Sequence, residues 1–162
     1  MNGIIVALKG KDCTGKTQTL KELVRTLLNG RVIYMSWEDD TILDNDKEDV
    51  RLIVVFDGII IGVDTQGDTG AKLEEMLLNK RLDEMKNKYN CSLIFCACKS
   101  YGKSENGTYG MVESFARTHN FGFLGTSTYY SEVAGLYPDI NTLNKIRAKE
   151  LLAFGLSISK NK

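Results

Sequence analysis

The stretch that decides the expected fold reads Gly10-Lys11-Asp12-Cys13-Thr14-Gly15-Lys16-Thr17. It fits the pattern G-x-x-x-x-G-K-[ST], in which glycines let successive backbone N–H groups turn toward a triphosphate. In this pattern Lys16 reaches the β- and γ-phosphates, and the Thr17 hydroxyl binds Mg²⁺. A chance glycine turn before a helix would give the same letters, so the flanking sequence has to decide between the two readings.

Both flanks have the context that a phosphate-binding loop requires. The apolar run at residues 4–8 predicts a buried strand, and residues 16–28 carry leucine and valine at helical spacing. Asn29-Gly30 then gives a helix-stop signal. Strand, glycine loop and helix together predict a nucleoside-triphosphate site. Its expected binding residues are Gly10, Lys11, Asp12, Cys13, Thr14, Gly15, Lys16, Thr17 and Gln18.

Length and charge narrow the class of protein. A chain of 162 residues is expected to form one domain, 1–162, with a core that needs no disulfides. Its 21 basic and 21 acidic residues cancel, which argues against nucleic acid or an anionic membrane as a partner. No apolar run approaches the roughly 18 residues of a membrane span, and no leader pattern is visible. We expect a soluble, cytoplasmic protein.

The four cysteines do not form a metal-binding or redox motif. Cys96 and Cys98 lie two apart in an apolar run and should pack on one face of a strand, with a strained redox pair as the alternative. Cys13 lies in the phosphate loop near a helix N-terminus, where a thiolate is favoured. The single histidine, His119, is expected to be structural.

Residues 37–49 form the most polar segment of the chain and carry seven carboxylates almost without bases. Such a run predicts a solvated, mobile surface loop. The alternative is a loop that folds over the phosphates, with Thr41 as a second Mg²⁺ ligand.

The next segment predicts a hairpin. Two β-rich runs, 51–56 and 59–63, flank Asp57-Gly58, which is the strongest short-range hairpin signal. Ligands bind at the carboxyl ends of parallel strands. If the second run lies parallel to residues 4–8, its end at Asp64 is expected beside the phosphate loop. Asp64 is therefore the better Mg²⁺ ligand, and Asp57 belongs to the turn.

Asp64-Thr65-Gln66-Gly67 reads D-x-x-G, and with the preceding elements it resembles the Ras-like small GTPases of the P-loop NTPase superfamily. By that resemblance Asp64 would hold Mg²⁺ through water, and the Gly67 N–H would sense the γ-phosphate. Asp68 stands where that family carries its water-orienting glutamine, with Gln66 as a rival. Together with Lys16, these two are the candidate catalytic residues, and slow hydrolysis is implied.

The base-reading element of the same family is incomplete here. Cys98-Lys99-Ser100-Tyr101 stands where those GTPases carry N-K-x-D, so only Lys99 matches. Without the aspartate that accepts from guanine, ATP becomes the expected nucleotide. Lys99 and Tyr101 remain candidates for stacking on the base.

The remaining segments complete an alternation of strands and helices. Helices are expected at about 69–89, from about 108, and from Pro138 to a stop at Gly155, with a strand at 121–127 and a frayed tail at 159–162. The last helix carries the apolar residues Ile140, Leu143, Ile146 and Leu152. The predicted fold is α/β: a three-layer P-loop NTPase fold whose sheet is mostly parallel, with one antiparallel strand from the hairpin near 51–64.

Three functions fit these signals. The first is a slow NTPase or nucleotide switch, favoured by the hairpin and D-x-x-G. The second is a small-molecule or nucleotide kinase, since residues 11–18 resemble the thymidylate-kinase loop and Lys99 with Lys103 suits a phosphate-closing lid. The third is a module that binds nucleotide without turnover. The chain also resembles uncharacterised bacterial ATP-binding P-loop proteins.

Overall fold

The computed structural model describes residues 2–10, 15–45, 47–66, 72–99, 107–128 and 139–160. The strands are β1 (Gly3–Gly10), β2 (Arg31–Met35), β3 (Arg51–Phe56), β4 (Ile59–Asp64), β5 (Leu93–Lys99) and β6 (Phe121–Ser127). The helices are α1 (Lys16–Leu27), α2 (Lys72–Asp83), α3 (Gly107–Thr118) and α4 (Ile140–Lys160). A 3₁₀ turn, η1 (Asp40–Asp44), follows β2, and a π-helical segment, η2 (Glu84–Lys88), continues α2.

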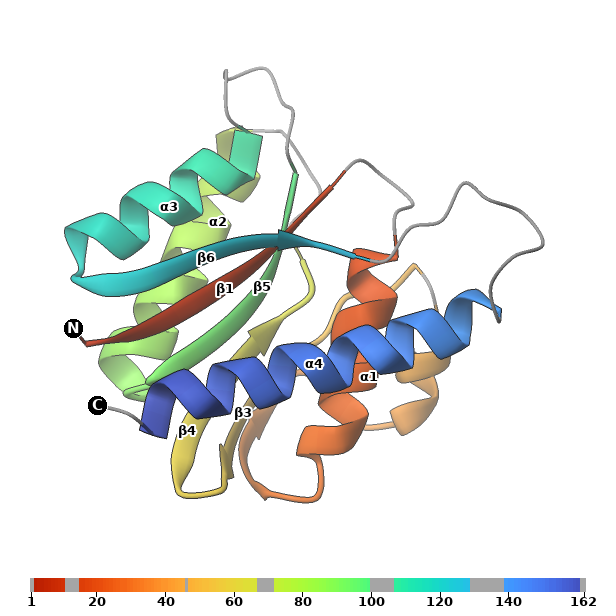
Figure 1. Ribbon diagram of the computed structural model, residues 1–162. Coiled ribbons are helices and arrows are strands. Elements are labelled where there is room, and N and C mark those ends of the chain that lie inside the picture. The colour runs from red at the N-terminus through yellow and green to blue at the C-terminus, as the bar shows by residue number, and fades with distance from the viewer. Residues whose placement is uncertain are drawn as a thin grey trace.

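The strands form one mixed sheet in the order β2-β3-β4-β5-β1-β6 (Figure 1). Four neighbouring strands, β4, β5, β1 and β6, run parallel to one another. β3 is antiparallel to both of its neighbours, β2 and β4. The prediction of a mostly parallel sheet with one antiparallel strand is therefore confirmed.

The hairpin between β3 and β4 turns on Asp57 and Gly58, as expected. Both residues have positive φ, 51° and 77°, which a two-residue type I′ turn requires. The register runs from Phe56 opposite Ile59 to Arg51 opposite Asp64. A local turn signal was enough to fix this pairing.

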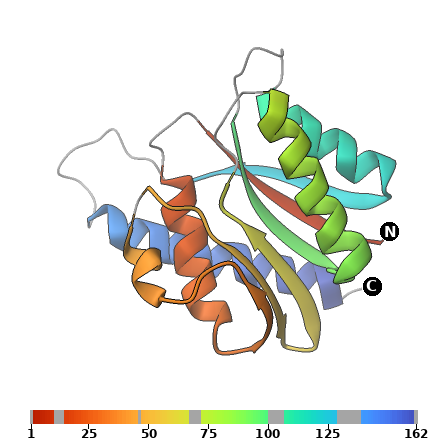
Figure 2. The ribbon, with the colours of Figure 1, turned by 180° about the vertical axis from the view of Figure 1, so that it is seen from behind.

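Helices cover both faces of the sheet and give the molecule three layers (Figures 1 and 2). One core lies under α1 and α4 and includes Val6, Leu8 and Phe95. The other lies under α2 and α3 and includes Ile5, Ala7 and Cys96. Within the described ranges, no helix is long and apolar enough to cross a membrane.

The last helix differs from its prediction at its end. It does not stop at Gly155 but continues to Lys160. A Cβ at Gly155 would lie 2.9 Å from side-chain carbons of Leu93 and Phe95, so the glycine allows α4 to lie close on β5. Of the apolar residues noted on this helix, Ile140 and Ile146 are exposed and Leu152 is buried. The buried face carries Asn144, Ala148, Leu151, Leu152 and Gly155.

The acidic segment is anchored rather than loose. Its carboxylates are largely exposed, as predicted, but Trp37 and Leu43 are buried in the core under α1. Lys21 of α1 is fully buried, and its Nζ donates to the carbonyl oxygens of Ile42 (2.9 Å) and Asn45 (2.5 Å). Two apolar side chains and a buried lysine therefore hold the segment to α1, and its mobility stays a prediction.

Candidate functional site

The carboxyl ends of the parallel strands bring several predicted residues to one edge of the sheet. Gly10 at the end of β1 lies beside Lys99 at the end of β5. On the other side of β1, Lys9 is paired with Ser127 of β6. In open α/β sheets this edge is where ligands bind. Gly10 and Lys99 were both predicted to bind the nucleotide, and their pairing in the sheet agrees with one shared site.

In the described part of the phosphate-loop sequence, the Lys16 side chain contacts the end of β1. Gly15 is the N-cap residue of α1 and has the left-handed conformation (φ 77°, ψ 13°); it makes no side-chain capping hydrogen bond. The Lys16 side chain folds back, and its Nζ donates to the Gly10 carbonyl oxygen at 3.1 Å. The N–H groups of a first helical turn and the helix dipole favour an anion at such an end. Lys11, Asp12, Cys13 and Thr14 lie outside the described residues.

Helix α4 contacts this turn through a residue that sequence reasoning missed. Asn144 is only 5 % exposed, and its Oδ1 accepts a hydrogen bond from the buried Thr19 hydroxyl at 3.1 Å. The same Oδ1 lies 3.0 Å from the position that a Cβ on Gly15 would occupy. Thr17 and Gln18, in the same turn of α1, are half-buried. In the sequence, Asn144 is one of several polar residues of the last helix. It stands out only once the structure shows which face of that helix is buried.

Asp64 is buried at the end of β4, and both of its carboxylate oxygens are engaged. Oδ1 accepts from the Gln66 N–H at 3.0 Å, and Oδ2 accepts from Arg81 Nε of α2 at 2.5 Å. Arg81 also donates to the Gln66 carbonyl oxygen at 3.2 Å. Burial raises the pKa of Asp64 above its usual value, and the Arg81 guanidinium opposes that shift. Arg81 was not among the predicted site residues.

The position of Asp64 corrects the expectation that it would lie beside the phosphate loop. β5 separates β4 from β1, and the register aligns Asp64 with Cys96 and, through it, with Ala7. Two strand spacings amount to about 10 Å. Asp57 lies at the opposite end of β4 from Asp64, in the turn, where it pairs with Lys160. Its assignment to turn chemistry is confirmed.

Asp64 and Thr17 also belong to opposite faces of the sheet. Ile61 and Val63 of β4 pack in the core under α1 and α4. Side chains alternate along a strand, so Asp64 faces the other way, and its bond to Arg81 on α2 agrees. The two predicted Mg²⁺ ligands are therefore not assembled into one centre. The described ranges hold no group of three or more His, Cys, Asp or Glu that suits a metal.

The other predicted residues are placed only in part. Gln66 is half-buried, and its backbone N–H and carbonyl are both engaged in the contacts around Asp64. The Lys99 N–H donates to Thr108 Oγ1 at 2.8 Å, which joins the end of β5 to the start of α3. Thr41 is exposed, and its N–H donates to the Asp39 carboxylate. Gly67, Asp68, Tyr101 and Lys103 lie outside the described residues.

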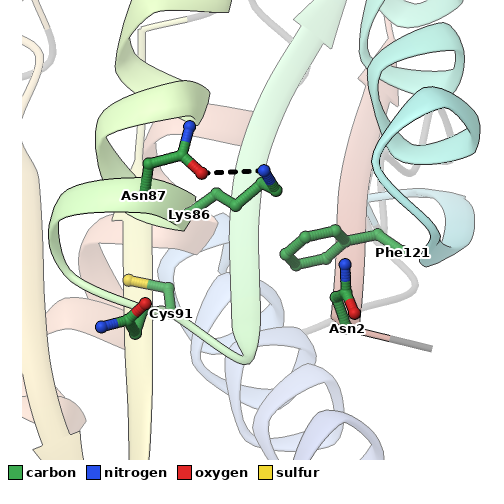
Figure 3. Close-up of a pocket in the computed structure, with 6 residues that line it drawn as sticks. Asn2, Lys86, Asn87, Cys91 and Phe121 are labelled. Carbon is green, nitrogen blue, oxygen red and sulfur yellow. Dashed lines mark hydrogen bonds between the residues drawn. The ribbon is translucent and has the colours of Figure 1, made fainter.

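A pocket of about 310 Å³ lies at the opposite edge of the sheet, beside the starts of β1, β5 and β6 (Figure 3). Asn2, Cys91 and Phe121 line it, together with Lys86, whose ammonium donates to the Asn87 side chain. Burial raises the pKa of the Cys91 thiol to about 12, so the thiol stays protonated at neutral pH. The pocket offers no activated nucleophile and no carboxylate, and we do not take it as the functional site.

Cys96, Cys98 and His119 have packing contacts, as their predicted structural roles require. Cys96 and Cys98 are buried on the α2–α3 face of β5, with their sulfur atoms 4.0 Å apart. Both cysteines are free thiols. His119 stacks against Phe115, with ring centroids 4.2 Å apart. None of these three residues belongs to the segment around Gly10, Gly15 and Lys16.

Comparisons with protein-family models, with curated proteins and with solved structures give no match for this chain. The function is therefore inferred from the residues of the site.

Proposed function

We propose that this chain binds a nucleoside triphosphate, with ATP preferred, at the turn between β1 and α1. The observation that carries the proposal is the Lys16 ammonium, which reaches back to the Gly10 carbonyl oxygen at the N-terminal end of α1. This arrangement puts a cation and the N-terminal end of a helix dipole at one end of a glycine-rich segment. The chemistry suits the β- and γ-phosphates of a nucleotide.

The surroundings supply further support from the described residues. The register sets Lys99 beside Gly10, so a second cation belongs to the same edge of the sheet. Mg²⁺, when bound, would neutralise phosphate charge, and the Thr17 hydroxyl in the first turn of α1 suits it as a ligand. Asp64 does not fit as the partner ligand in the observed arrangement, because Arg81 and the Gln66 N–H hold its oxygens.

For the reaction we propose slow NTP hydrolysis or nucleotide-dependent switching. The alternative is a small-molecule or nucleotide kinase, which the position of Lys99 next to Gly10 favours because a basic side chain there suits a transferring phosphoryl group. Single-turnover ATP hydrolysis with and without candidate acceptors separates the two. Rapid ADP release only when an acceptor is present would exclude the switch, and binding without turnover would favour a non-catalytic module.

The binding proposal is tested by replacing Lys16. Lys16→Met keeps the apolar stem and removes the ammonium. We expect ATP affinity in titration calorimetry to fall by about 100-fold or more, since a hydrogen bond to a charged group contributes about 1.5–3 kcal/mol and the charge itself is lost. Lys9→Met is the matched control, because Lys9 is exposed and lies over the Tyr109 ring. Equal affinity in the two folded variants would refute the site.

A further inference from the structure

The contact between α4 and the Gly15–Lys16 turn is specific and polar. Asn144 is a polar member of the buried face of α4, whose other members are alanine, leucine and glycine. A buried amide costs free energy unless it is hydrogen-bonded, and here Oδ1 accepts from the Thr19 hydroxyl. An alanine or leucine at position 144 would match the rest of that face. The asparagine therefore calls for a reason beyond packing.

Asn144 contacts two residues at the start of α1, Thr19 and Gly15. Thr19 is fully buried, and its N–H donates to the Gly15 carbonyl oxygen at 2.8 Å. Its hydroxyl donates to Asn144, so Thr19 is held from Gly15 on one side and from α4 on the other. Asn144 Oδ1 also lies 3.0 Å from the position of a Cβ on Gly15, so a side chain there would press on Asn144. A shift of α4 at this point must move the first turn of α1.

We propose that Asn144 is a positioning residue for the nucleotide: acting through Thr19 and Gly15, it fixes the turn that receives the phosphates and couples α4 to nucleotide occupancy. This inference rests on the proposed function. Lys16 directly follows Gly15, so the conformation of Gly15 sets where the Lys16 ammonium and the first N–H groups of α1 point. Affinity for the triphosphate thus depends on a residue more than 120 positions away in the sequence.

The sharpest test changes the charge of Asn144 and keeps its shape. Asn144→Asp puts a carboxylate against Gly15, and it should repel a triphosphate more than a monophosphate. We expect ATP affinity to fall by about tenfold or more, the size of effect that one unit charge a few ångströms away produces inside a protein. The loss for AMP should be clearly smaller. Asn141→Asp is the matched control, since Asn141 is exposed one turn earlier on the same helix; it should change ATP affinity less than twofold.

A second variant tests the same bond from α1. Thr19→Val has nearly the same shape and removes the hydroxyl that Asn144 accepts from. Thr19→Val, Asn144→Ala and the double variant form a cycle in which ATP affinities should be non-additive, because either change breaks one shared contact. Melting temperatures measured without nucleotide separate a loss of affinity from a loss of folding. If Asn144→Asp does not fold, the Thr19→Val affinity decides: an unchanged value overturns the inference.

The outcomes distinguish the two proposals. If the unaltered protein binds ATP and folded Asn144→Asp binds it equally well, the role of Asn144 is refuted while nucleotide binding stands. Equal losses for ATP and AMP would reduce Asn144 to a structural residue and overturn the positioning role. If the unaltered protein binds no nucleotide at millimolar concentration, the proposed function fails and this inference fails with it.

Discussion

Replacing Arg81 by methionine tests whether Asp64 is held as one half of a buried ion pair. The Asp64 side chain is 2 % exposed and that of Arg81 16 % exposed, with Nε 2.5 Å from Oδ2. Arg81→Met removes this contact and the bond to the Gln66 carbonyl. Among the described residues, it leaves the carboxylate with the Gln66 N–H as its hydrogen-bond donor. Breaking one side of a buried pair costs about 3–5 kcal/mol, because the other charge stays buried without compensation.

The pH dependence of this loss has a definite sign. Burial already raises the pKa of Asp64 in the folded state, and Arg81 opposes the rise. Without Arg81 the folded pKa rises further above the unfolded value, so the folded variant binds a proton more tightly than the unfolded chain. Its stability is then greatest below the unfolded pKa and is lost as pH rises through the folded pKa. The difference from the unaltered protein should be largest at neutral pH and should narrow in acid.

Urea unfolding between pH 5 and 8, followed by circular dichroism, measures the effect. At pH 7 the midpoint should fall, and the melting temperature should drop by about 10 °C, at about 2–4 °C per kcal/mol for a chain of this size. Arg117→Met is the control: Arg117 pairs with Glu113 across an exposed helix face and should cost less than about 0.5 kcal/mol. The double variant Arg81→Met/Asp64→Asn should lose the pH dependence. A loss below about 1 kcal/mol that does not change with pH would refute the buried pair.

Two further predictions concern packing that positions the site. Gly155→Val should destabilise the protein by about 1–3 kcal/mol in urea unfolding, because a side chain there meets β5. Ala153→Val, on the exposed side of α4, should cost well under 1 kcal/mol. Equal costs would contradict the close approach of α4. Lys21→Met should shift Trp37 fluorescence to the red and lower stability by about 2 kcal/mol, since two backbone carbonyls lose a charged donor. Lys149→Met, at an exposed position, should change neither, and an unshifted Trp37 emission in Lys21→Met would show that the lysine does not hold the acidic segment.

Features set by neighbouring residues were predictable from the sequence. The hairpin follows from Asp57-Gly58, because two consecutive positive φ values leave little choice of turn. The turn at Gly15 and Lys16 follows from the glycine pattern, and the strand before it from an unbroken apolar run. Each of these signals acts within a few residues, so no knowledge of the rest of the fold was needed.

Features set by distant residues were not predictable. Nothing in the apolar runs of β1, β4 and β5 says which two are neighbours. β5 lies between β1 and β4, so Asp64 does not end beside β1 as expected. The end of α4 was misread because Gly155 carries a general stop signal, and its closeness to β5 became visible only in the packed structure. Asn144 and Arg81 act on partners 125 and 17 residues away, so no local pattern marks them.

The side of the sheet on which Asp64 lies determines which groups its carboxylate can bind. β4 is buried on both sides, so its sequence lacks the alternation that would reveal which residues face α1. The structure sets Ile61 and Val63 on the α1 side and leaves Asp64 to Arg81 on the other. Thr65, one residue further, donates its hydroxyl to Asp49 and accepts from the N–H of Val50, which packs in the core under α1. At this end of β4 the carboxylate linked to the α1 side is therefore that of Asp49, in the acidic segment, and Asp64 serves to fasten the strand to α2.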